Sequence, residues 1–476
     1  MTEAPNKSMH TYDLAVIGGG AGGLVVASVA AQLGLRVALV EKEKQLGGDC
    51  LHFGCVPSKS LLRSAHVAHL ADEARDYGIE VTRSATDMQR VNACIRRAID
   101  RIQQHDSHER FRELGCEIFT GTARFVDANR IRVGDIEIRA RRYVIATGSS
   151  AWIPAIEGLQ SVDYLTNEDM FSLAALPEHL LVLGAGPVGV EMAQAYARLG
   201  SRVSLIELAD RVLPQFDRDI SRMLKQQLLS EDINIVHGET RLVSQQGETR
   251  TVVLDDGRSL SGDQLLVAIG RRPVVTGLGL EQAGVDYTEK GIRVNARMQT
   301  SRRHIYACGD VTGQMPLTHV AEQQAGVIIA NALFRLPKRM DYRVIPAVVY
   351  TEPECAQVGM QADEAVQDAS VKVVQFDMKQ LDRAITDNTD HGVMKLIVRK
   401  GRLAGAHAIG HHAGELIHEL ALAIRENMKL SKITTLVHAY PSYSQLNRRA
   451  ASQYYRDSLF SPVTANLVKV LSRWLP

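Results

Sequence analysis

The chain has 476 residues and a mass of 52.3 kDa, a size at which about three domains of ordinary length are expected. Hydrophobic residues make up 45% of it and charged residues 23%, which is typical of a globular protein. The net charge of +1 leaves no basic surface of the kind that nucleic acid requires, so we expect no nucleic-acid partner. The first residues are polar and lack the apolar core of a signal peptide, and no window reaches about 18 consecutive apolar residues. We therefore expect a cytoplasmic protein.

The first predicted elements form a strand, a glycine turn and a helix. Residues 12–17 (YDLAVI) are an apolar run typical of a buried strand, and GGGAGG follows at once and opens an Ala-rich helical pattern. The spaced glycines Gly18, Gly20 and Gly23 permit a tight turn, close approach of the backbone to a pyrophosphate, and close packing of the helix on the strand. A second strand ends in Glu41, which is placed to bind a ribose hydroxyl.

The next stretch, residues 47–59 (GGDCLHFGCVPSK), places Cys50 and Cys55 close together. Their spacing suits half of a metal site, a structural cross-link or a redox-active pair. Only six cysteines occur, four of them singly, and no second CxxC or HxxxH lies nearby to complete a zinc site, so we expect no metal centre. A structural disulfide is disfavoured in a reducing compartment.

The strand, turn and helix return later in the chain, at LLVLGAGPVGVEMAQAYARLGSRVSLIEL. Aligning Gly18 with Gly184 also aligns Glu41 with Glu207, without a gap. Each copy closes with a similar strand and turn, RYVIATGSS in the first and DQLLVAIGRR in the second. Two copies in register predict two doubly wound nucleotide-binding domains and therefore two cofactors. A further segment, IYACGDVTG, offers Asp310 after a strand and a glycine, where an isolated Asp is more often a turn residue.

Together these motifs resemble the FAD-dependent pyridine nucleotide-disulfide oxidoreductases, the family of dihydrolipoamide dehydrogenase, glutathione reductase and mercuric reductase. The resemblance covers nearly the whole chain and includes GTARF, IGRRP, VVYTEPECAQVG and AGELIHELALAI besides the motifs above. It implies an α/β fold with two Rossmann-like domains, for FAD and NAD(P), and a C-terminal α+β dimerisation domain. The implied boundaries are 1–155 for the FAD domain, 156–274 for the NAD(P) domain, 275–343 for a central segment completing the FAD domain, 344–460 for the interface domain and 461–476 for an amphipathic tail.

The resemblance also assigns cofactor positions. Those for FAD are Gly18, Gly20, Gly23, Glu41, Gly48, Lys59, Ala123, Thr147, Gly148, Asp310, Leu317, Thr318 and His319. Those for NAD(P) are Gly184, Gly186, Gly189, Glu207 and Gly270. Asp310 is expected at the ribityl chain, and the helix that begins at Leu317 is expected to face the pyrimidine edge of the flavin. Lys59 and Glu191 are expected to form an ion pair near the flavin N5.

The acid of the second unit favours NADH over NADPH. The carboxylate of Glu207 can accept hydrogen bonds from a ribose 2′-hydroxyl but repels a 2′-phosphate. Arg202 and Arg211 lie near in the sequence and could offset that repulsion.

By resemblance, the cysteine pair belongs to a relay for two electrons that runs from nicotinamide through flavin to sulfur. Cys50 is then the interchange thiol that meets the substrate, and Cys55 is the charge-transfer thiol held against the flavin. A position near a helix start favours the nucleophilic thiolate.

One motif departs from the family pattern. Disulfide reductases of this family carry a His directly before a Pro, and a Glu five residues later, as the base that one subunit supplies to the other. In HAYPSYSQ these positions hold Tyr440 and Gln445, and a phenol with pKa about 10 accepts protons poorly compared with an imidazole of about 6.5. His438 and His52 are candidates to compensate, although packing or exposure is the commoner role. Mercuric reductases also lack that base, but they use a C-terminal cysteine pair, and no cysteine follows Cys355.

The sequence thus predicts a homodimeric FAD enzyme that passes electrons from NAD(P)H to a small or protein-bound disulfide, a dithiol or a thiol-bound metal. The alternatives are a flavin-dependent transhydrogenase, diaphorase or quinone reductase with secondary cysteines, or a non-catalytic redox-sensing scaffold. In the tail, Leu467, Val470, Leu471 and Trp474 have helical spacing; we expect packing against the dimer rather than contact with a membrane surface. The predicted catalytic residues are Cys50, Cys55, Lys59, Glu191, Tyr440, Gln445 and His438.

Overall fold

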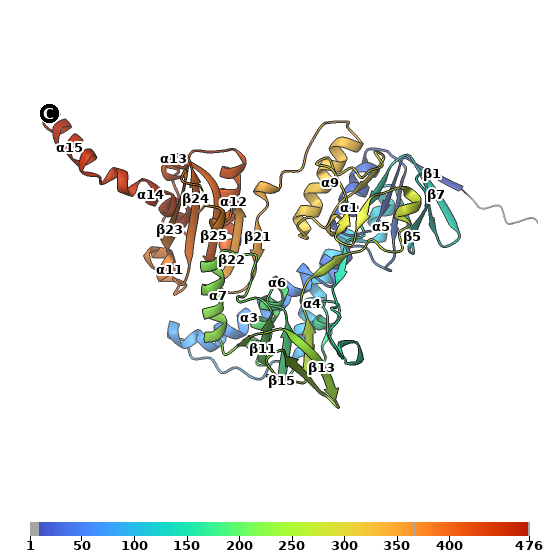
Figure 1. The fold of residues 1–476 in the computed structure, drawn as a ribbon, viewed down its shortest axis with the longest axis horizontal. Coiled ribbons are helices and arrows are strands. Elements are labelled where there is room, and N and C mark those ends of the chain that lie inside the picture. Colours follow the sequence, from blue (N-terminus) through green and yellow to red (C-terminus); the bar gives the residue numbers. More distant parts are fainter. Residues whose placement is uncertain (1–8, 366–367, 475–476) are drawn as a thin grey trace, which may run out of the picture. The chain divides into compact units, whose positions relative to one another are not determined.

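Residues 9–365 and 368–474 are described by a computed structural model of the chain (Figure 1). The chain divides into two compact units. The first unit runs to Gly184 and adds Arg198–Val203 and Thr240–Asp341, and the second consists of Ala185–Ala197, Ser204–Glu239 and the residues from Tyr342 onward. The last two residues of the predicted tail, Leu475 and Pro476, lie outside the described residues.

The centre of the first unit is a five-stranded parallel sheet with the order β20-β8-β2-β3-β4. Four of its five strands are short and fully buried, as expected for a sheet covered on both faces, and the edge strand β4 is partly exposed. Helices α1 and α9 pack against each other beside it. The bounds are β2 (Leu14–Ile17), α1 (Ala21–Gln32), β3 (Val37–Glu41), β4 (Cys116–Thr120), β8 (Tyr143–Ile145), β20 (Ile305–Ala307) and α9 (Thr318–Ala332).

The predicted strand over residues 12–17 is divided in two. Residues 9–12 form β1 (Met9–Tyr12), which pairs in parallel with β7 (Ile136–Ala140), whereas the strand of the central sheet begins at Leu14. The break falls at Asp13, whose carboxylate accepts a hydrogen bond from Arg36 N, 3.1 Å away. The apolar run therefore serves two sheets, the second of which has the order β1-β7-β6-β5.

The remaining elements of the first unit include further pairings of strands. Strand β10 pairs in parallel with β16, and β13, β14 and β15 form an antiparallel sheet. The helices are α2 (Gly48–His52), α3 (Cys55–Glu73), α4 (Met88–Gln103), α5 (His108–Glu113) and α8 (Leu280–Ala283). The strands are β5 (Ala123–Asp127), β6 (Arg130–Val133), β9 (Ser149–Ala151), β10 (His179–Leu183), β13 (Thr240–Gln246), β14 (Thr249–Leu254), β15 (Ser259–Gly262), β16 (Gln264–Val267), β17 (Arg271–Pro273), β18 (Tyr287–Thr288) and β19 (Gly291–Ile292).

The second unit contains a five-stranded antiparallel sheet with the order β21-β22-β25-β24-β23. Alternate residues of its inner strands join α12, α13 and α14 in one apolar core. The strands are β21 (Ala347–Val349), β22 (Glu354–Gly359), β23 (Val371–Asp377), β24 (Val393–Arg399) and β25 (Arg402–Gly410). The helices are α10 (Ala362–Ala365), α11 (Asp382–Thr386), α12 (Ala413–Arg425), α13 (Leu430–Thr435), α14 (Gln445–Leu459) and α15 (Pro462–Leu471).

The second glycine turn lies where the two units divide. It is followed by α6 (Pro187–Leu199), β11 (Arg202–Glu207), α7 (Arg218–Ser230) and β12 (Asn234–His237), and β11 pairs with β12 in parallel. The predicted fold class, α/β with a C-terminal α+β domain, is confirmed. The five predicted domain boundaries stay predictions.

Within the described residues, no helix combines the length and the apolarity needed to cross a lipid bilayer.

Candidate active site

The first glycine turn lies between β2 and α1, and its geometry requires glycine. A Cβ atom on Gly23 would lie 2.0 Å from the carbonyl oxygen of Gly18, so any side chain there would push the helix off the strand. Helix α1 has Gly20 at its N-cap, and no side chain caps it. The first-turn N–H groups are therefore available to an anion, which fits the pyrophosphate of a dinucleotide.

The two predicted acids hold their turns in the same way. Glu41 accepts hydrogen bonds from Gly19 N at 2.6 Å and from Glu43 N at 2.9 Å. Glu207 accepts the corresponding bonds from Ala185 N at 2.6 Å and from the amide two residues beyond it at 2.8 Å. The repeat found in the sequence thus extends to individual hydrogen bonds. Each carboxylate lies beside its glycine turn and keeps lone pairs for ribose hydroxyls.

The glycine pair of GGDC joins the cysteine segment to the first turn. Gly47 N donates to the oxygen of Gly19 at 2.8 Å, and Gly47 forms an isolated bridge with Gly20. Gly48 has φ +65°, and a Cβ on it would lie 2.7 Å from the Cα of Gly20. The backbone contact leads directly into α2 and α3, so it places the cysteines beside the predicted phosphate site.

The two sulfurs contact each other and the start of α9. Cys50 and Cys55 are free thiols in hydrogen-bonding contact. Thr318, the first residue of α9, has its Oγ1 3.4 Å from Cys55 Sγ and also contacts Cys50. The hydrogen bond with Cys55 and burial raise the pKa of the Cys50 thiol, while the Thr318 hydroxyl opposes that rise. Cys50 is half-buried and Cys55 is exposed.

A polar network that sequence reasoning missed supports this segment. Arg271 lies 3.2 Å from Asp49, the neighbour of Cys50, and also donates to Ser149 Oγ at 2.8 Å. Ser149 in turn donates to Asp310 Oδ2 at 2.5 Å, and Asn167 donates to Asp49 at 3.0 Å. The predicted ribityl-site acid is therefore connected to the cysteine segment through Arg271. The only signal in the sequence was the arginine pair of IGRRP.

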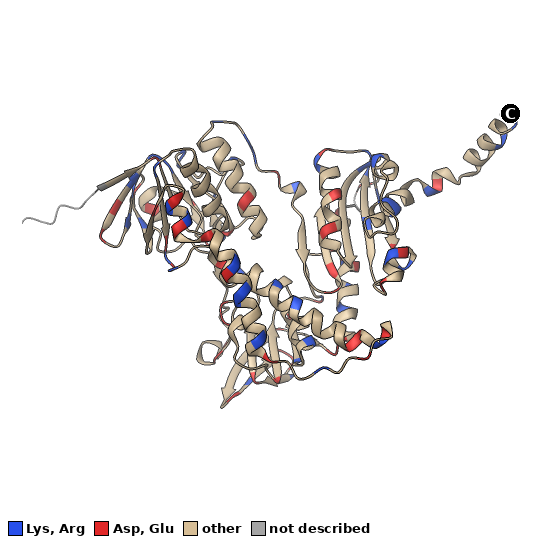
Figure 2. Ribbon diagram, turned by 180° about the vertical axis from the view of Figure 1, so that it is seen from behind, with Lys and Arg blue, Asp and Glu red and all other residues tan. Residues whose placement is uncertain are grey.

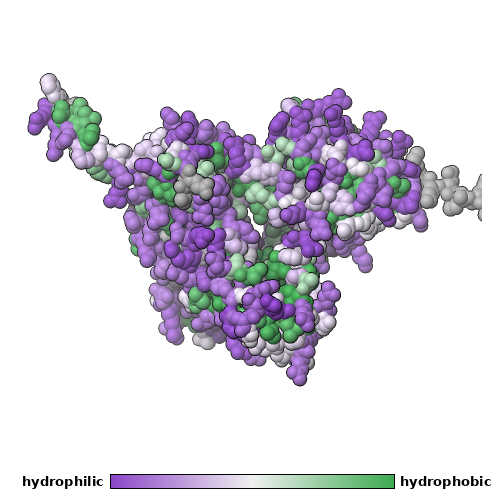
Figure 3. Space-filling view, in the orientation of Figure 1, coloured by the Kyte–Doolittle hydropathy of each residue, from purple (hydrophilic) through white to green (hydrophobic). Residues whose placement is uncertain are grey.

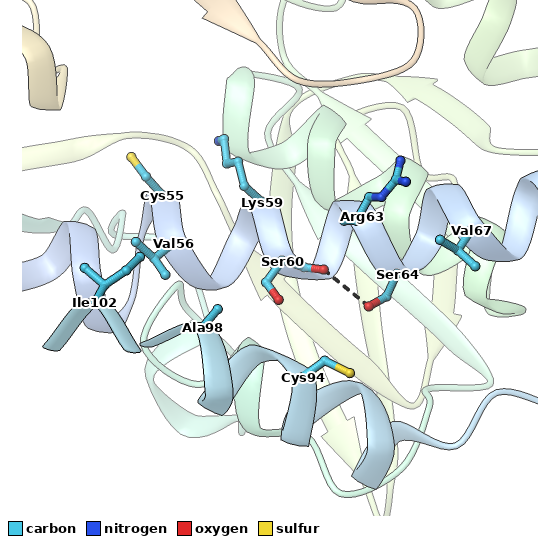
Figure 4. Close-up of a pocket in the computed structure, with 10 residues that line it drawn as sticks. All are labelled: Cys55, Val56, Lys59, Ser60, Arg63, Ser64, Val67, Cys94, Ala98 and Ile102. Carbon is cyan, nitrogen blue, oxygen red and sulfur yellow. Dashed lines mark hydrogen bonds between the residues drawn. The ribbon is translucent and has the colours of Figure 1, made fainter. Parts of the chain in front are cut away.

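Cys55 also lies at one end of a groove between α3 and α4, with a volume of about 760 Å³ (Figure 4). Val56 and Ile102 flank that end, and Cys94 lies toward the other end, where its Sγ accepts a hydrogen bond from Arg97 at 2.9 Å. The lining residues are Cys55, Val56, Lys59, Ser60, Arg63, Ser64, Val67, Cys94, Ala98 and Ile102. The groove leaves open space beside the exposed thiol of Cys55. Sequence reasoning did not find it because α3 and α4 carry no motif that pairs them.

Other predicted cofactor residues lie at the ends of strands and helices of the first unit. Thr147 Oγ1 donates to the oxygen of Val274 at 3.0 Å, and the neighbouring Gly148 has open space where a Cβ would be. Leu317 is the N-cap of α9, and His319 follows Thr318 in its first turn. Ala123 begins β5, and Gly270 precedes β17.

The predicted Lys59–Glu191 ion pair stays a prediction. Lys59 is on α3 and Glu191 is on α6. Glu191 is buried and accepts a hydrogen bond from Tyr350 N at 2.8 Å. Gly186 and Gly189 lie just before and within α6, as the alignment of the two turns predicts.

In the second unit, the segment that departs from the family pattern presents a phenol. Tyr440 is 69% exposed, and its hydroxyl is hydrogen-bonded to Asp382, which raises the pKa of the phenol. Gln445 is buried at the start of α14. The ring nitrogens of His438 lie 3.3 Å from Glu419 Oε2 and 3.2 Å from the oxygen of Leu436. Tyr440 therefore stays protonated at neutral pH and is a poor proton acceptor.

His52, the other histidine predicted as a candidate base, also makes a hydrogen-bonding contact. His52 Nε2 lies 2.9 Å from the oxygen of Leu46, and this contact holds its ring against the loop that precedes the cysteines.

Comparison with protein families matches two parts of the chain. Residues 12–325 match the model described as pyridine nucleotide-disulphide oxidoreductase, and residues 345–451 match that family's dimerisation domain.

Individual proteins match over nearly the full length. The chain is 33% identical over 454 residues to a mercuric reductase of Lysinibacillus sphaericus, covering 94% of this chain and 83% of that protein. It is 34% identical over 444 residues to a dihydrolipoyl dehydrogenase of Bacillus subtilis, covering 91% of this chain and 96% of that protein. Among solved structures, the HOCl-induced flavoprotein disulfide reductase RclA from Escherichia coli superimposes with a TM-score of 0.85 at 27% identity, over 93% of this chain and 99% of that one.

Proposed function

Because the chain belongs to the pyridine nucleotide-disulphide oxidoreductase family and is a flavin-dependent enzyme, we propose that it reduces a disulfide or a thiol-bound soft metal ion through Cys50 and Cys55. The observation that carries this proposal is the contact of Cys50, Cys55 and Thr318 beside the first glycine turn. A pair of sulfurs in contact, one of them open to a groove, is suited to forming and opening a disulfide.

The family indicates FAD and a pyridine nucleotide as cofactors. The open N-terminus of α1, the turn at Gly20 and the acid Glu41 fit FAD, and the equivalent turn with Glu207 fits the nicotinamide nucleotide. When bound, these two cofactors supply hydride and pass two electrons to sulfur.

The two cysteines are sufficient for a complete cycle of thiol–disulfide exchange. After the Cys50–Cys55 disulfide takes up two electrons, the thiolate of Cys50 attacks a substrate disulfide, forming a mixed disulfide and releasing one substrate thiol. Cys55 then attacks the sulfur of Cys50, the internal disulfide forms again, and the second substrate thiol leaves. Each released thiolate needs one proton. The hydroxyl of Thr318 touches both sulfurs and can hold a proton there.

The weak basicity of Tyr440 favours one direction of the reaction. The protonated phenol, hydrogen-bonded to Asp382, accepts a proton poorly from an incoming dithiol, and reduction of a disulfide does not require that step. We therefore favour the reducing direction over dithiol oxidation. Reduction of a thiol-bound metal ion is the second candidate, since relatives include mercuric reductases and a Cu(II) complex of RclA has been solved. The dimerisation domain suggests a homodimer in which Tyr440 serves the partner's site.

Anaerobic titration of the purified holoenzyme with NADH tests the proposal. We expect two-electron reduction to produce a long-wavelength thiolate-to-flavin charge-transfer band that the Cys55→Ser variant lacks. A substrate panel of lipoamide, glutathione disulfide, Hg(II), Cu(II) and a quinone then identifies the acceptor. Cys50→Ser should abolish disulfide turnover but keep dye reduction, and Cys94→Ser, which changes another half-buried cysteine outside the pair, is the matched control. Full turnover by Cys50→Ser would instead support a transhydrogenase, diaphorase or quinone reductase.

NADH is the proposed reductant because of Glu207. Replacing this carboxylate by glutamine removes the charge that repels a 2′-phosphate, so the ratio of kcat/KM for NADH to that for NADPH should fall at least tenfold. An unchanged ratio would show that Arg202 or Arg211 already accommodates the phosphate.

A further inference from the structure

The last helix of the described chain is well formed but covered by nothing. The N-terminus of helix α15 has two common stabilising features. Ser461 is the N-cap and accepts a hydrogen bond from Thr464 N at 3.2 Å, and Pro462 occupies the first turn. No residue of α15 is buried, and it extends from the end of α14 (Figure 1). Such a short helix has little stability of its own, so an exposed apolar face requires a binding surface.

Five large apolar side chains of residues 463–474 share one face, and Val468 lies outside it. At 100° per residue, Val463, Leu467, Val470 and Leu471 fall within an arc of about 100°, and Trp474 continues the same face. All five are more than half exposed; Val463 reaches 79% and Trp474 83%. Figure 3 shows the apolar cluster on this helix.

The charged side chains of α15 and the turn that follows it have one sign. Lys469 and Arg473 lie off the apolar face, and no acidic residue occurs from position 458 onward. Figure 2 shows basic and no acidic positions along the helix. An apolar face ending in Trp, with cations beside it, is the pattern of a helix that binds at a lipid interface.

We propose that α15 binds to the surface of a bilayer containing anionic phospholipid, with its apolar face at the boundary between headgroups and acyl chains. A helix of ten residues is about 15 Å long, so it is too short for a hydrocarbon core of about 30 Å and lies in the plane of the surface. Lys469 and Arg473 then lie among lipid phosphates.

The alternative binding partner of α15 is a second copy of the chain. From sequence alone, the short apolar stripe favours this alternative. Two features favour lipid. The match to the family's dimerisation domain ends at residue 451, before α15 begins. Pairing two copies of α15 would also bring together cations that have no acidic partner on that helix.

Vesicle flotation with the FAD-loaded full chain tests the proposal. We expect the wild type to float with vesicles of phosphatidylcholine and phosphatidylglycerol. Lys469→Gln with Arg473→Gln should lower the partition coefficient about thirtyfold, the contribution of two charges at an anionic surface. Leu467→Gln with Leu471→Gln should lower it more than about a hundredfold, because two large apolar side chains lose their burial.

The matched control is Ala465→Gln with Val468→Gln, which makes the same kind of change on the opposite face of α15. This pair should float like the wild type. In addition, the emission of Trp474, obtained as the difference between the wild type and Trp474→Phe, should shift to the blue with anionic vesicles. Flavin absorbance and NADH reduction verify that each variant is folded.

Two results would overturn the proposal. One is failure of the wild type to float with anionic vesicles. The other is flotation of Leu467→Gln/Leu471→Gln that equals flotation of the control pair. Sedimentation velocity tests the alternative binding partner: if the leucine variant falls from dimer to monomer while the wild type binds no vesicles, α15 packs against a second copy.

Discussion

Replacing Lys395 by methionine removes the only cation among three charged side chains that join α7 to β24. Its Nζ lies 2.8 Å from each carboxylate oxygen of Asp217 and 2.9 Å from Asp219. The side chains of Lys395 and Asp217 are only 8% and 3% exposed. The substitution therefore leaves a buried carboxylate without a counter-charge.

The expected cost is about 3–5 kcal/mol of unfolding free energy, the range for removing one partner of a buried ion pair. Most of that cost comes from the abandoned carboxylate. Asp217 is also the N-cap of α7 and accepts hydrogen bonds from Asp219 N and Ile220 N. Asparagine retains that capping role, so adding Asp217→Asn to Lys395→Met should recover most of the loss.

Urea unfolding of the second unit, followed by circular dichroism, measures these differences. Arg222→Met is the matched control, because Arg222 pairs with Asp219 at 2.8 Å on the surface, with side chains 68% and 42% exposed. It should cost no more than about 0.5 kcal/mol. The reasoning is refuted if Lys395→Met costs as little as this control, or if the double variant is as unstable as the single one.

The cluster of Lys395, Asp217 and Asp219 stabilises the fold only within a defined pH range. Burial alone would raise the pKa of Asp217, but the hydrogen bonds and charge of Lys395 lower it below its ordinary value. Its contribution is therefore present above that ordinary value, about 3.9, and is lost as pH falls through the lowered pKa. Burial alone would lower the pKa of Lys395, but its bonds to the two carboxylates raise it. The contribution of Lys395 to stability is fully present below about pH 10.4 and is lost as pH rises through the raised pKa of Lys395.

The other predictions concern the cofactor site and the sulfurs. Gly48→Ala should lower flavin retention after desalting, because its Cβ meets the facing backbone at 2.7 Å, whereas Gly134→Ala, with the same left-handed backbone but open space, should retain it. Tyr440→His with Gln445→Glu should raise dihydrolipoamide oxidation by on the order of a hundredfold, and unchanged turnover would show that the base is not what limits it. Thr318→Val should move the pH profile of Cys50 alkylation to higher pH, while Thr318→Ser should not, since serine keeps the hydroxyl that lowers the pKa of the Cys50 thiol.

The parts of the site that are local in sequence could be predicted. The strand, glycine turn and helix around Gly23 depend on spacing within one segment, and the alignment of Glu41 with Glu207 placed both acids at their turns. The one local error, a single strand over residues 12–17, arose because an apolar run does not show which sheet its residues join.

The contacts between distant segments could not be predicted in this way. Thr318 reaches the sulfurs from 263 residues beyond Cys55, and Arg271 reaches Asp49 from the end of the second nucleotide-binding region. Neither residue belongs to a pattern that names its partner. The groove beside Cys55 likewise depends on how α3 and α4 pack, which their polar sequences leave open.

The separation of Thr318 from the cysteines has a consequence for how the protein is made. Strand β20 and helix α9 close the sheet and the redox site, yet both follow the whole second nucleotide-binding region in the chain. At about 5–20 residues per second, a ribosome needs roughly 13–50 s to reach Thr318 after Cys55. In a nascent chain, both thiols are therefore synthesised before α9 is available to pack against them. During this interval the thiols are most exposed to unwanted oxidation.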